Sequence, residues 1–213
     1  MLKNHDHAPL HIAVSHNALL APLGALLAKQ RAEEPETPVR IIETTRQDQA
    51  KGLIEGRYTL GFSTSVLDEG SVCSVPLWRD ELAVAVPLRS PLLAFADIPL
   101  EQVVRYPLIL LSLGSHETPG RQIDSLLKTA KTAPNVAEQV QSFELMMALI
   151  AAGYGIGICT RSHISALRRM GIVMRPLAGK PHYVTTYLIQ SHRPPPAVVG
   201  RLIQRAHAVQ MPC

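Results

Sequence analysis

The first third of the chain alternates short apolar runs with segments of helical periodicity, and this alternation constrains the fold more than any other feature. The apolar runs that predict strands are residues 10–14, 39–42 and 58–62. Residues 17–31 and 47–55 are the predicted helices between them, and Gly56 suits the left-handed backbone that ends the second. Strand–helix–strand units place their strands parallel, with right-handed crossovers. The sequence therefore predicts an α/β fold on a parallel sheet.

The rest of the chain predicts a second α/β series and a return to the first. Two strands, residues 72–77 and 81–87, follow the opening series and are joined by a short link at 78–80. The second series is expected to comprise helices at 101–105, 119–130, 143–152 and 162–169, with strands at 108–111, 136–140, 154–158 and near 173. A late strand at 183–189 then leads to a final helix that ends near 209.

This order predicts two Rossmann-like lobes joined by two crossover segments, near residues 87 and 187. Lobe I is expected to hold residues 8–87 plus 188–213, and lobe II residues 88–187. In open α/β sheets, ligands bind at the carboxyl ends of the strands. We therefore expect a ligand site between the lobes.

The most distinctive segment of the second series is QSFELMMALIAAGYGIGIC, residues 141–159. One face of its helix is apolar at the i, i+3, i+4, i+7 spacing of Phe143, Met146, Met147 and Ile150. Gly153 then stops the helix, and Gly155 and Gly157 enter the strand, where glycine lets the backbone lie against another segment or a ligand. We expect this strand to border the cleft.

Composition narrows the class of protein. Hydrophobic residues make up 46% of the 213 residues and charged residues 18%, which is typical of a globular protein and excludes a disordered one. Aromatic residues are only 4%, so a surface that stacks nucleic-acid bases is poorly supplied. The odd set of Cys73, Cys159 and Cys213 has no metal-like spacing and predicts free thiols in a cytoplasmic protein. Residues 1–9 lack the apolar run of a signal peptide, no run is long enough to span a membrane, and the abrupt first strand suggests a domain of a longer protein.

Motifs for catalysis, metal binding or nucleotide binding are weak. His5, His7 and His11 alternate as metal ligands can, but at the chain start, where a metal site is a poor prediction. The glycines at 153, 155 and 157 follow a helix and lack the last glycine of a dinucleotide fingerprint, whose place Ile158 takes. Cys159 fits a small core residue better than a nucleophile. We expect no catalytic residue, no metal and no cofactor.

Hydroxyl residues recur where the predicted strands end. They are Ser15, Thr44, Thr45, Ser63, Thr64, Ser65, Ser112 and Ser115. Each alone is as well explained by a helix cap or a turn, but together they put hydroxyl and backbone N–H groups at the edge where a parallel sheet binds ligands. Arg46, at the start of the second helix, would favour a carboxylate, and a solvated arginine is the alternative.

Four segments, in order, resemble the effector-binding domain of LysR-type transcriptional regulators. They are LHIAVSHNALLAPLGALLAKQ at 10–30, VRIIETTRQDQAKGLIEGRYTLGF at 39–62, VPLWRDELAVAVPLRSPL at 75–92 and QSFELMMALIAAGYGIGIC at 141–159. The resemblance implies a fold like that of type 2 periplasmic binding proteins, with a small-molecule effector in the cleft. The positions that it assigns to ligand binding are Ser15, His16, Asn17, Thr44, Thr45, Arg46, Ser63, Thr64, Ser112, Leu113, Gly114, Ser115, Phe143, Gly157 and Ile158.

The resemblance also implies partners. Homodimers would form through the first helix and the helix at 162–169, and tetramers in the full-length protein. DNA would be bound only by a winged helix-turn-helix that this chain lacks, and no membrane is involved. Gly61 stands where the family usually has alanine, so the effector cannot be transferred from a relative, although Arg46 favours an anionic metabolite. A solute-binding protein or an enzyme on the same scaffold, or a structural module, are the alternatives.

Overall fold

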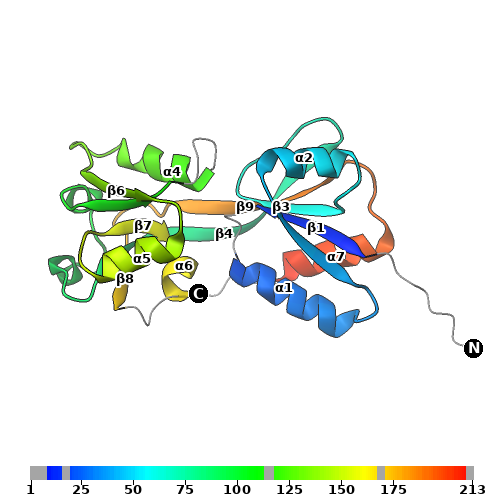
Figure 1. Ribbon diagram of the computed structural model, residues 1–213, viewed down its shortest axis with the longest axis horizontal. Coiled ribbons are helices and arrows are strands. Elements are labelled where there is room, and N and C mark those ends of the chain that lie inside the picture. Colours follow the sequence, from blue (N-terminus) through cyan, green and yellow to red (C-terminus); the bar gives the residue numbers. More distant parts are fainter. Residues whose placement is uncertain (1–8, 16–19, 113–117, 167–170, 210–213) are drawn as a thin grey trace, which may run out of the picture. The chain divides into compact units, whose positions relative to one another are not determined.

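The computed structural model describes residues 9–15, 20–112, 118–166 and 171–209, which form two compact α/β units (Figure 1). The first unit holds residues 1–79 and 185–213, and the second residues 80–184. Strands β4 (Val72–Pro87) and β9 (Tyr183–Ser191) each run from one unit into the other. The boundary between the units falls at residues 79/80 in β4 and 184/185 in β9, whereas the crossovers are predicted near residues 87 and 187.

The first unit is built on a parallel sheet, as predicted. Strands β1 (Leu10–Ser15), β2 (Val39–Thr44) and β3 (Leu60–Ser63) lie in the order β2-β1-β3, all parallel, and β9 adds to β3 in the antiparallel sense. Apolar side chains of α1 (Leu20–Glu33) and α7 (Ala197–Ala208) pack on one face of this sheet. Helix α2 (Arg46–Ile54) covers the other face (Figure 1).

Helix α1 begins at Leu20, and Asn17, where the sequence predicts its start, lies outside the described residues. Pro22 falls in the first turn, where a missing N–H does little harm. Leu23 and Leu26 are buried against the sheet, whereas Ala25 faces solvent. The apolar side of α1 therefore serves the core, and its small residues remain on the outside.

The second unit combines helices with strands of two sheets, one of which is the seven-stranded sheet that also contains β9 and the strands of the first unit. Strands β5 (Leu108–Leu111) and β6 (Val136–Val140) are parallel, and the second half of β4 pairs in the antiparallel sense with β7 (Gly157–Thr160) and β8 (Ile172–Pro176). Side chains of α3 (Leu100–Val103) and α4 (Thr118–Leu127) pack in one apolar cluster. Those of α5 (Phe143–Ala151) and α6 (Arg161–Ala166) pack in another. A short 3-10 helix, η1 (Pro91–Ala94), follows β4.

The prediction of two strands at 72–77 and 81–87 is wrong, because β4 is one continuous strand. The expected link contains Trp78, whose side chain is only 2% exposed and stacks on Phe62 at 5.1 Å between ring centroids. The indole Nε1 donates a hydrogen bond to the carbonyl oxygen of Ala206 in α7 (3.1 Å). These contacts hold the backbone extended at residues 78–80, where the sequence predicts a short link.

In the part of the chain that the structure describes, every helix is too short or too polar to cross a membrane.

Candidate functional site

The three parallel strands of the first unit each end in a hydroxyl residue. Thr44 ends β2 and pairs in register with Ser15, which ends β1. On the other side of β1, Val14 pairs with Phe62, so that Ser63, the last residue of β3, follows next to Ser15. The sequence prediction that hydroxyls gather at this sheet edge is confirmed for these strands.

Two of these hydroxyls are buried and have no hydrogen-bond partner among the described residues. Ser15 is 6% exposed and Thr44 is 5% exposed. Among the described residues, neither Ser15 Oγ nor Thr44 Oγ1 has a hydrogen-bond partner. A buried polar group left unpaired costs about 1–3 kcal/mol, so such groups usually have a reason to be there.

The third strand end is arranged differently. Ser63 Oγ accepts a hydrogen bond from the backbone N–H of Ser65 (3.1 Å), so this hydroxyl helps to form a turn. Thr64, between them, is 2% exposed. The turn explanation that the sequence left open therefore applies to Ser63.

The start of α2 lies directly after β2. Thr45 is its N-cap, and Thr45 Oγ1 accepts from the backbone N–H of Asp48 (3.3 Å). A helix N-terminus carries partial positive charge and favours an anion nearby. Arg46 is exposed, and its Nη2 donates to the carbonyl oxygen of Val66 (3.1 Å), so its guanidinium is partly engaged by the protein itself.

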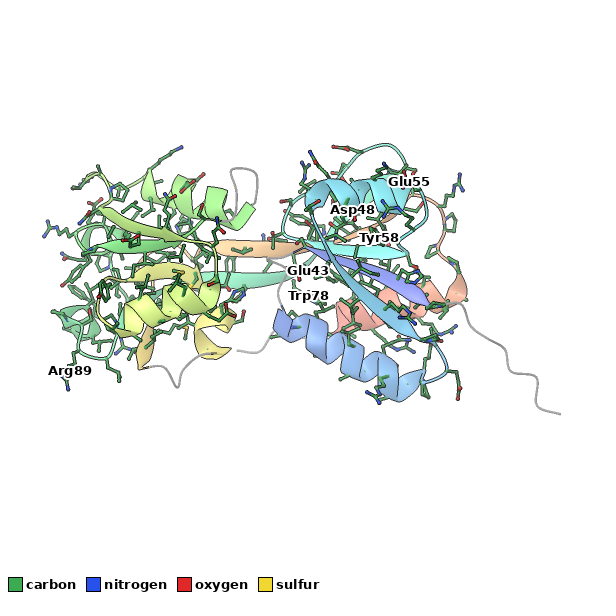
Figure 2. All side chains as sticks on the ribbon, in the orientation of Figure 1. Glu43, Asp48, Glu55, Tyr58, Trp78 and Arg89 are labelled. Atoms are coloured by element: carbon green, nitrogen blue, oxygen red, sulfur yellow. The ribbon has the colours of Figure 1, made fainter. Side chains whose placement is uncertain are left out.

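On the α2 side of the first unit, residues that follow α2 bond back to its first turn. Tyr58 Oη donates to Asp48 Oδ2 (2.6 Å), and Arg57 bonds the other carboxylate oxygen (3.0 Å). The hydrogen bond from Tyr58 and the charge of Arg57 lower the pKa of Asp48. Figure 2 shows Asp48, Glu55 and Tyr58 on this side of the first unit. The ring of Tyr58 lies where a Cβ on Gly52 would sit, only 2.3 Å away, so Gly52 permits the contact.

Gln49 holds α2 to the sheet beneath the strand ends, and sequence reasoning missed it. Its side chain is fully buried, and Nε2 donates to the carbonyl oxygens of Ala13 (3.0 Å) and Phe62 (3.2 Å). A Cβ on Gly61 would lie 3.1 Å from this amide. The departure from the family pattern at Gly61 was the one signal in the sequence, because a smaller residue there leaves room for a polar group.

In the second unit, the predicted site residues are mostly packing residues. A Cβ on Gly157 would lie 2.3 Å from Met146 Cε and 2.8 Å from Ile150 Cδ1, so this glycine admits α5 against β7. Ile158 is buried in the core. Ser112 is exposed just after β5. The assignment of these residues to a ligand site stays a prediction.

Phe143 lies in a polar cluster at the start of α5 and α6. Its ring contacts the imidazole of His163 at 4.7 Å between centroids, and His163 Nδ1 is 2.7 Å from Thr160 Oγ1. Burial lowers the pKa of His163, against the opposing effect of Asp80, so the neutral imidazole is favoured. Asp80 is buried and accepts from both Ser162 N (3.2 Å) and Ser162 Oγ (2.5 Å), which anchors α6 to β4. Sequence reasoning missed this pair, because nothing local links residues 80 and 162.

The remaining predicted positions, His16, Asn17, Leu113, Gly114 and Ser115, lie outside the described residues, as do His5 and His7. Burial raises the pKa of the Cys159 thiol, because it disfavours the charged thiolate. Within residues that the structure describes, no three His, Cys, Asp or Glu side chains are grouped to hold a metal ion.

The fold and these strand ends can now be compared with known proteins. Residues 3–210 match the family model of the LysR substrate binding domain. The chain belongs to this family. The identification made from the four sequence segments is therefore confirmed, and the family is one of transcription regulators rather than enzymes.

Individual proteins that are similar to this LysR domain support the family assignment. A probable cat1 operon transcriptional activator of Acinetobacter lwoffii is 25% identical over 159 residues, which are 74% of this chain and 52% of that protein. The chain thus spans about half the length of this curated relative. The structure of the BenM effector binding domain with its effector benzoate has a TM-score of 0.85 at 18% identity and covers 94% of this chain and 91% of that one. The effector binding domain of QuiR in complex with shikimate has a TM-score of 0.78 at 18% identity, covering 95% and 96%. These likenesses show the type 2 periplasmic-binding-protein-like fold that the sequence predicted.

Proposed function

We propose that this LysR domain senses a small carboxylate, and that the carboxyl ends of β1 and β2 hold the anionic group. One observation carries the proposal: Ser15 Oγ and Thr44 Oγ1 are buried, adjacent in register, and without a partner among the described residues. A carboxylate oxygen would satisfy both hydroxyl donors. Hydrogen bonds to a charged group contribute about 1.5–3 kcal/mol each, which exceeds the contribution of neutral ones.

Neighbouring features favour an anion over a neutral ligand. The N-terminus of α2 follows Thr45, and Arg46 is its first residue. Benzoate and shikimate, which the BenM and QuiR domains bind, are both carboxylates. The predicted contributions of Ser112 and its loop, Phe143 and Gly157 to ligand binding are retained as part of this proposal.

Replacing the two hydroxyls is expected to separate stability from binding. In the double variant Ser15→Ala, Thr44→Val, the free energy of unfolding without ligand should stay the same or rise by about 1 kcal/mol, because two unpaired buried hydroxyls are removed. The melting temperature should no longer respond to a carboxylate that stabilises the unchanged chain, found by screening benzoate, shikimate and other small acids. At 100 times Kd such a ligand stabilises by about 2.7 kcal/mol.

Matched controls make this test specific. Ser125→Ala removes an exposed hydroxyl in α4 and should leave the response intact. The amide of the active acid, such as benzamide for benzoate, should give no shift. A double variant that still responds as the unchanged chain does would show that the site lies elsewhere.

We extend the proposal to the longer regulator of which this domain would be a part. Ligand binding shifts the population of conformations by its differential affinity, and this alters how copies of the chain pack. DNA is bound by a further domain of the longer protein, in the cytoplasm, and this chain senses without catalysing. A periplasmic solute-binding protein or an enzyme is the alternative, and a gene that encodes an export signal upstream of this domain would favour the former.

We propose that the outer face of α1 packs against a second copy. Its exposed residues are small, which allows close approach of another helix; they are Ala21, Gly24, Ala25 and Ala28. Ala25→Arg is expected to convert a dimer to a monomer in sedimentation velocity, because a long charged side chain blocks this approach. Ala178→Arg, at an exposed loop of the second unit, should leave the dimer intact. An Ala25→Arg dimer as stable as that of the unchanged chain would exclude this face.

A further inference from the structure

The second unit contains a cavity of about 590 Å³ at the amino end of β5, opposite the end that carries Ser112. Four parts of the chain line it: the turn between β4 and η1, the residues before β5, the connection from α5 to β7, and Gly171 before β8. All four belong to the second unit. This volume lies within the range of about 300–1,000 Å³ that is common for small-molecule sites.

Backbone contacts hold the walls of this cavity in place. Ile156 N donates to the carbonyl oxygen of Pro107 (2.9 Å), and a Cβ on Gly155 would lie only 2.4 Å from that same oxygen. Leu88 N donates to the carbonyl oxygen of Gly171 (3.1 Å), which joins two of the lining turns. The cavity is therefore formed before any ligand arrives.

The rim of the cavity is unusually apolar for a solvent-facing surface. Tyr154 is 66% exposed and Leu88 62% exposed, the two highest values among the exposed large apolar residues of the described chain. Both line the cavity. Scattered apolar side chains on a surface need no explanation, but two that flank one concavity indicate a binding surface.

The charges around the cavity favour a ligand with an anionic group. Among the described residues that line the cavity, Arg89 is the only charged one, and Figure 2 shows it at the outer edge of the second unit. Ser90 Oγ accepts from Leu92 N (3.2 Å), so its own proton remains available for donation beside Arg89. The carboxyl end of α5, which also lines the cavity, carries partial negative charge and repels an anion. An anionic group is thus favoured on the Arg89 side, with an apolar body against Tyr154 and Leu88.

We propose that this cavity is a second ligand site, which takes a small monoanion with an apolar body. It is independent of the hydroxyls at the ends of β1 and β2. Occupancy of this site does not require the proposed sensing of a carboxylate by the first unit.

The probe for the test is 8-anilino-1-naphthalenesulfonate, a fluorescent monoanion with an apolar body. We expect saturable binding of one probe molecule to the cavity. Arg89→Gln and Tyr154→Ala should each weaken binding about tenfold or more, since a desolvated charged hydrogen bond or a stacked aromatic contributes about 1.4 kcal/mol or more. Both side chains are exposed at the rim, so the variants should keep the melting temperature of the unchanged chain.

Matched variants elsewhere on the second unit decide between a site and general surface adhesion. Arg105→Gln and Leu145→Ala remove an exposed arginine and an exposed apolar side chain outside the cavity, and should leave probe affinity unchanged. The variant Ser15→Ala, Thr44→Val should also bind the probe normally, which separates this site from the proposed sensing site. Equal losses in the cavity variants and in Arg105→Gln or Leu145→Ala, or no loss in the cavity variants, would overturn the proposal.

Discussion

Arg205→Ala is expected to lower the free energy of unfolding of the first unit by about 3–5 kcal/mol, because it removes one partner from a buried ionic network. The guanidinium in α7 contacts three side chains of α1 and its end: Nη2 bonds Glu34 (2.8 Å), Nη1 bonds Gln30 (2.7 Å), and Nε bonds Glu33. Arg205 is buried and the Glu34 side chain is only 14% exposed. Without the arginine, a carboxylate remains in a poorly solvated place.

The pH dependence of the free energy lost in Arg205→Ala tests whether the ionised Glu34 carboxylate is the cause of the loss. Hydrogen bonds from Arg201 and Arg205 lower the pKa of Glu34 from its ordinary 4.5 to about 2. Because the folded pKa is depressed, this stabilisation is complete above the unfolded pKa and is lost as pH falls through the folded value. The difference between the unchanged chain and Arg205→Ala, measured by urea denaturation, should therefore be larger at pH 7 than at pH 3.

Arg201→Ala is the matched control. Arg201 also bonds Glu34, but its side chain is half exposed, so we expect a loss below about 1 kcal/mol. If Arg205→Ala cost no more than Arg201→Ala at pH 7, α1 and α7 would not be joined by a buried ionic network.

Trp78→Ala is expected to cost about 3–5 kcal/mol, because it leaves a large cavity beside Phe62 and removes the side-chain hydrogen bond to the carbonyl oxygen of Ala206. Trp78→Phe keeps an aromatic ring against Phe62 and loses only the donor and some volume, so its cost should be about 1–2 kcal/mol. Circular dichroism in urea is the suitable measurement, since Trp78 is the only tryptophan and its loss removes the fluorescence signal.

Phe95→Ala provides the comparison for Trp78, because this ring is 37% exposed and its removal should cost clearly less than that of the indole. A Trp78→Ala chain as stable as Phe95→Ala would mean that residues 78–80 form a link outside the core. The structure instead makes this residue part of the core that α7 covers.

Much of the candidate site could be predicted because strand ends are encoded locally. Ser15 and Thr44 follow apolar runs directly, and parallel strands necessarily bring their carboxyl ends to one edge. What the pattern could not predict is that both hydroxyls are buried without a partner among the described residues. Nor could it predict that Gln49 of α2 contacts Ala13 and Phe62, because these residues are far apart in the chain.

The glycines show the same difference between what the sequence predicts and what only the packing of distant segments decides. The sequence correctly indicates a close approach at Gly157 but not the approaching group, which is the pair Met146 and Ile150 of α5. At Gly153 the local prediction is complete, because φ of +85° closes α5 as expected. A backbone angle depends on neighbours in the chain, whereas the group that fills an absent side chain comes from another segment.

By itself, the sequence determined the family, the α/β class and most elements, because hydrophobic periodicity and glycine stops act within a few residues. Only the tertiary structure decided that Trp78 is core, that Asp80 anchors Ser162, that Arg205 joins α7 to α1, and that Leu88 and Tyr154 flank one cavity. Each of these joins residues far apart in the chain. Their energies come from burial and from satisfied or unsatisfied polar groups, and these exist only once the segments have packed.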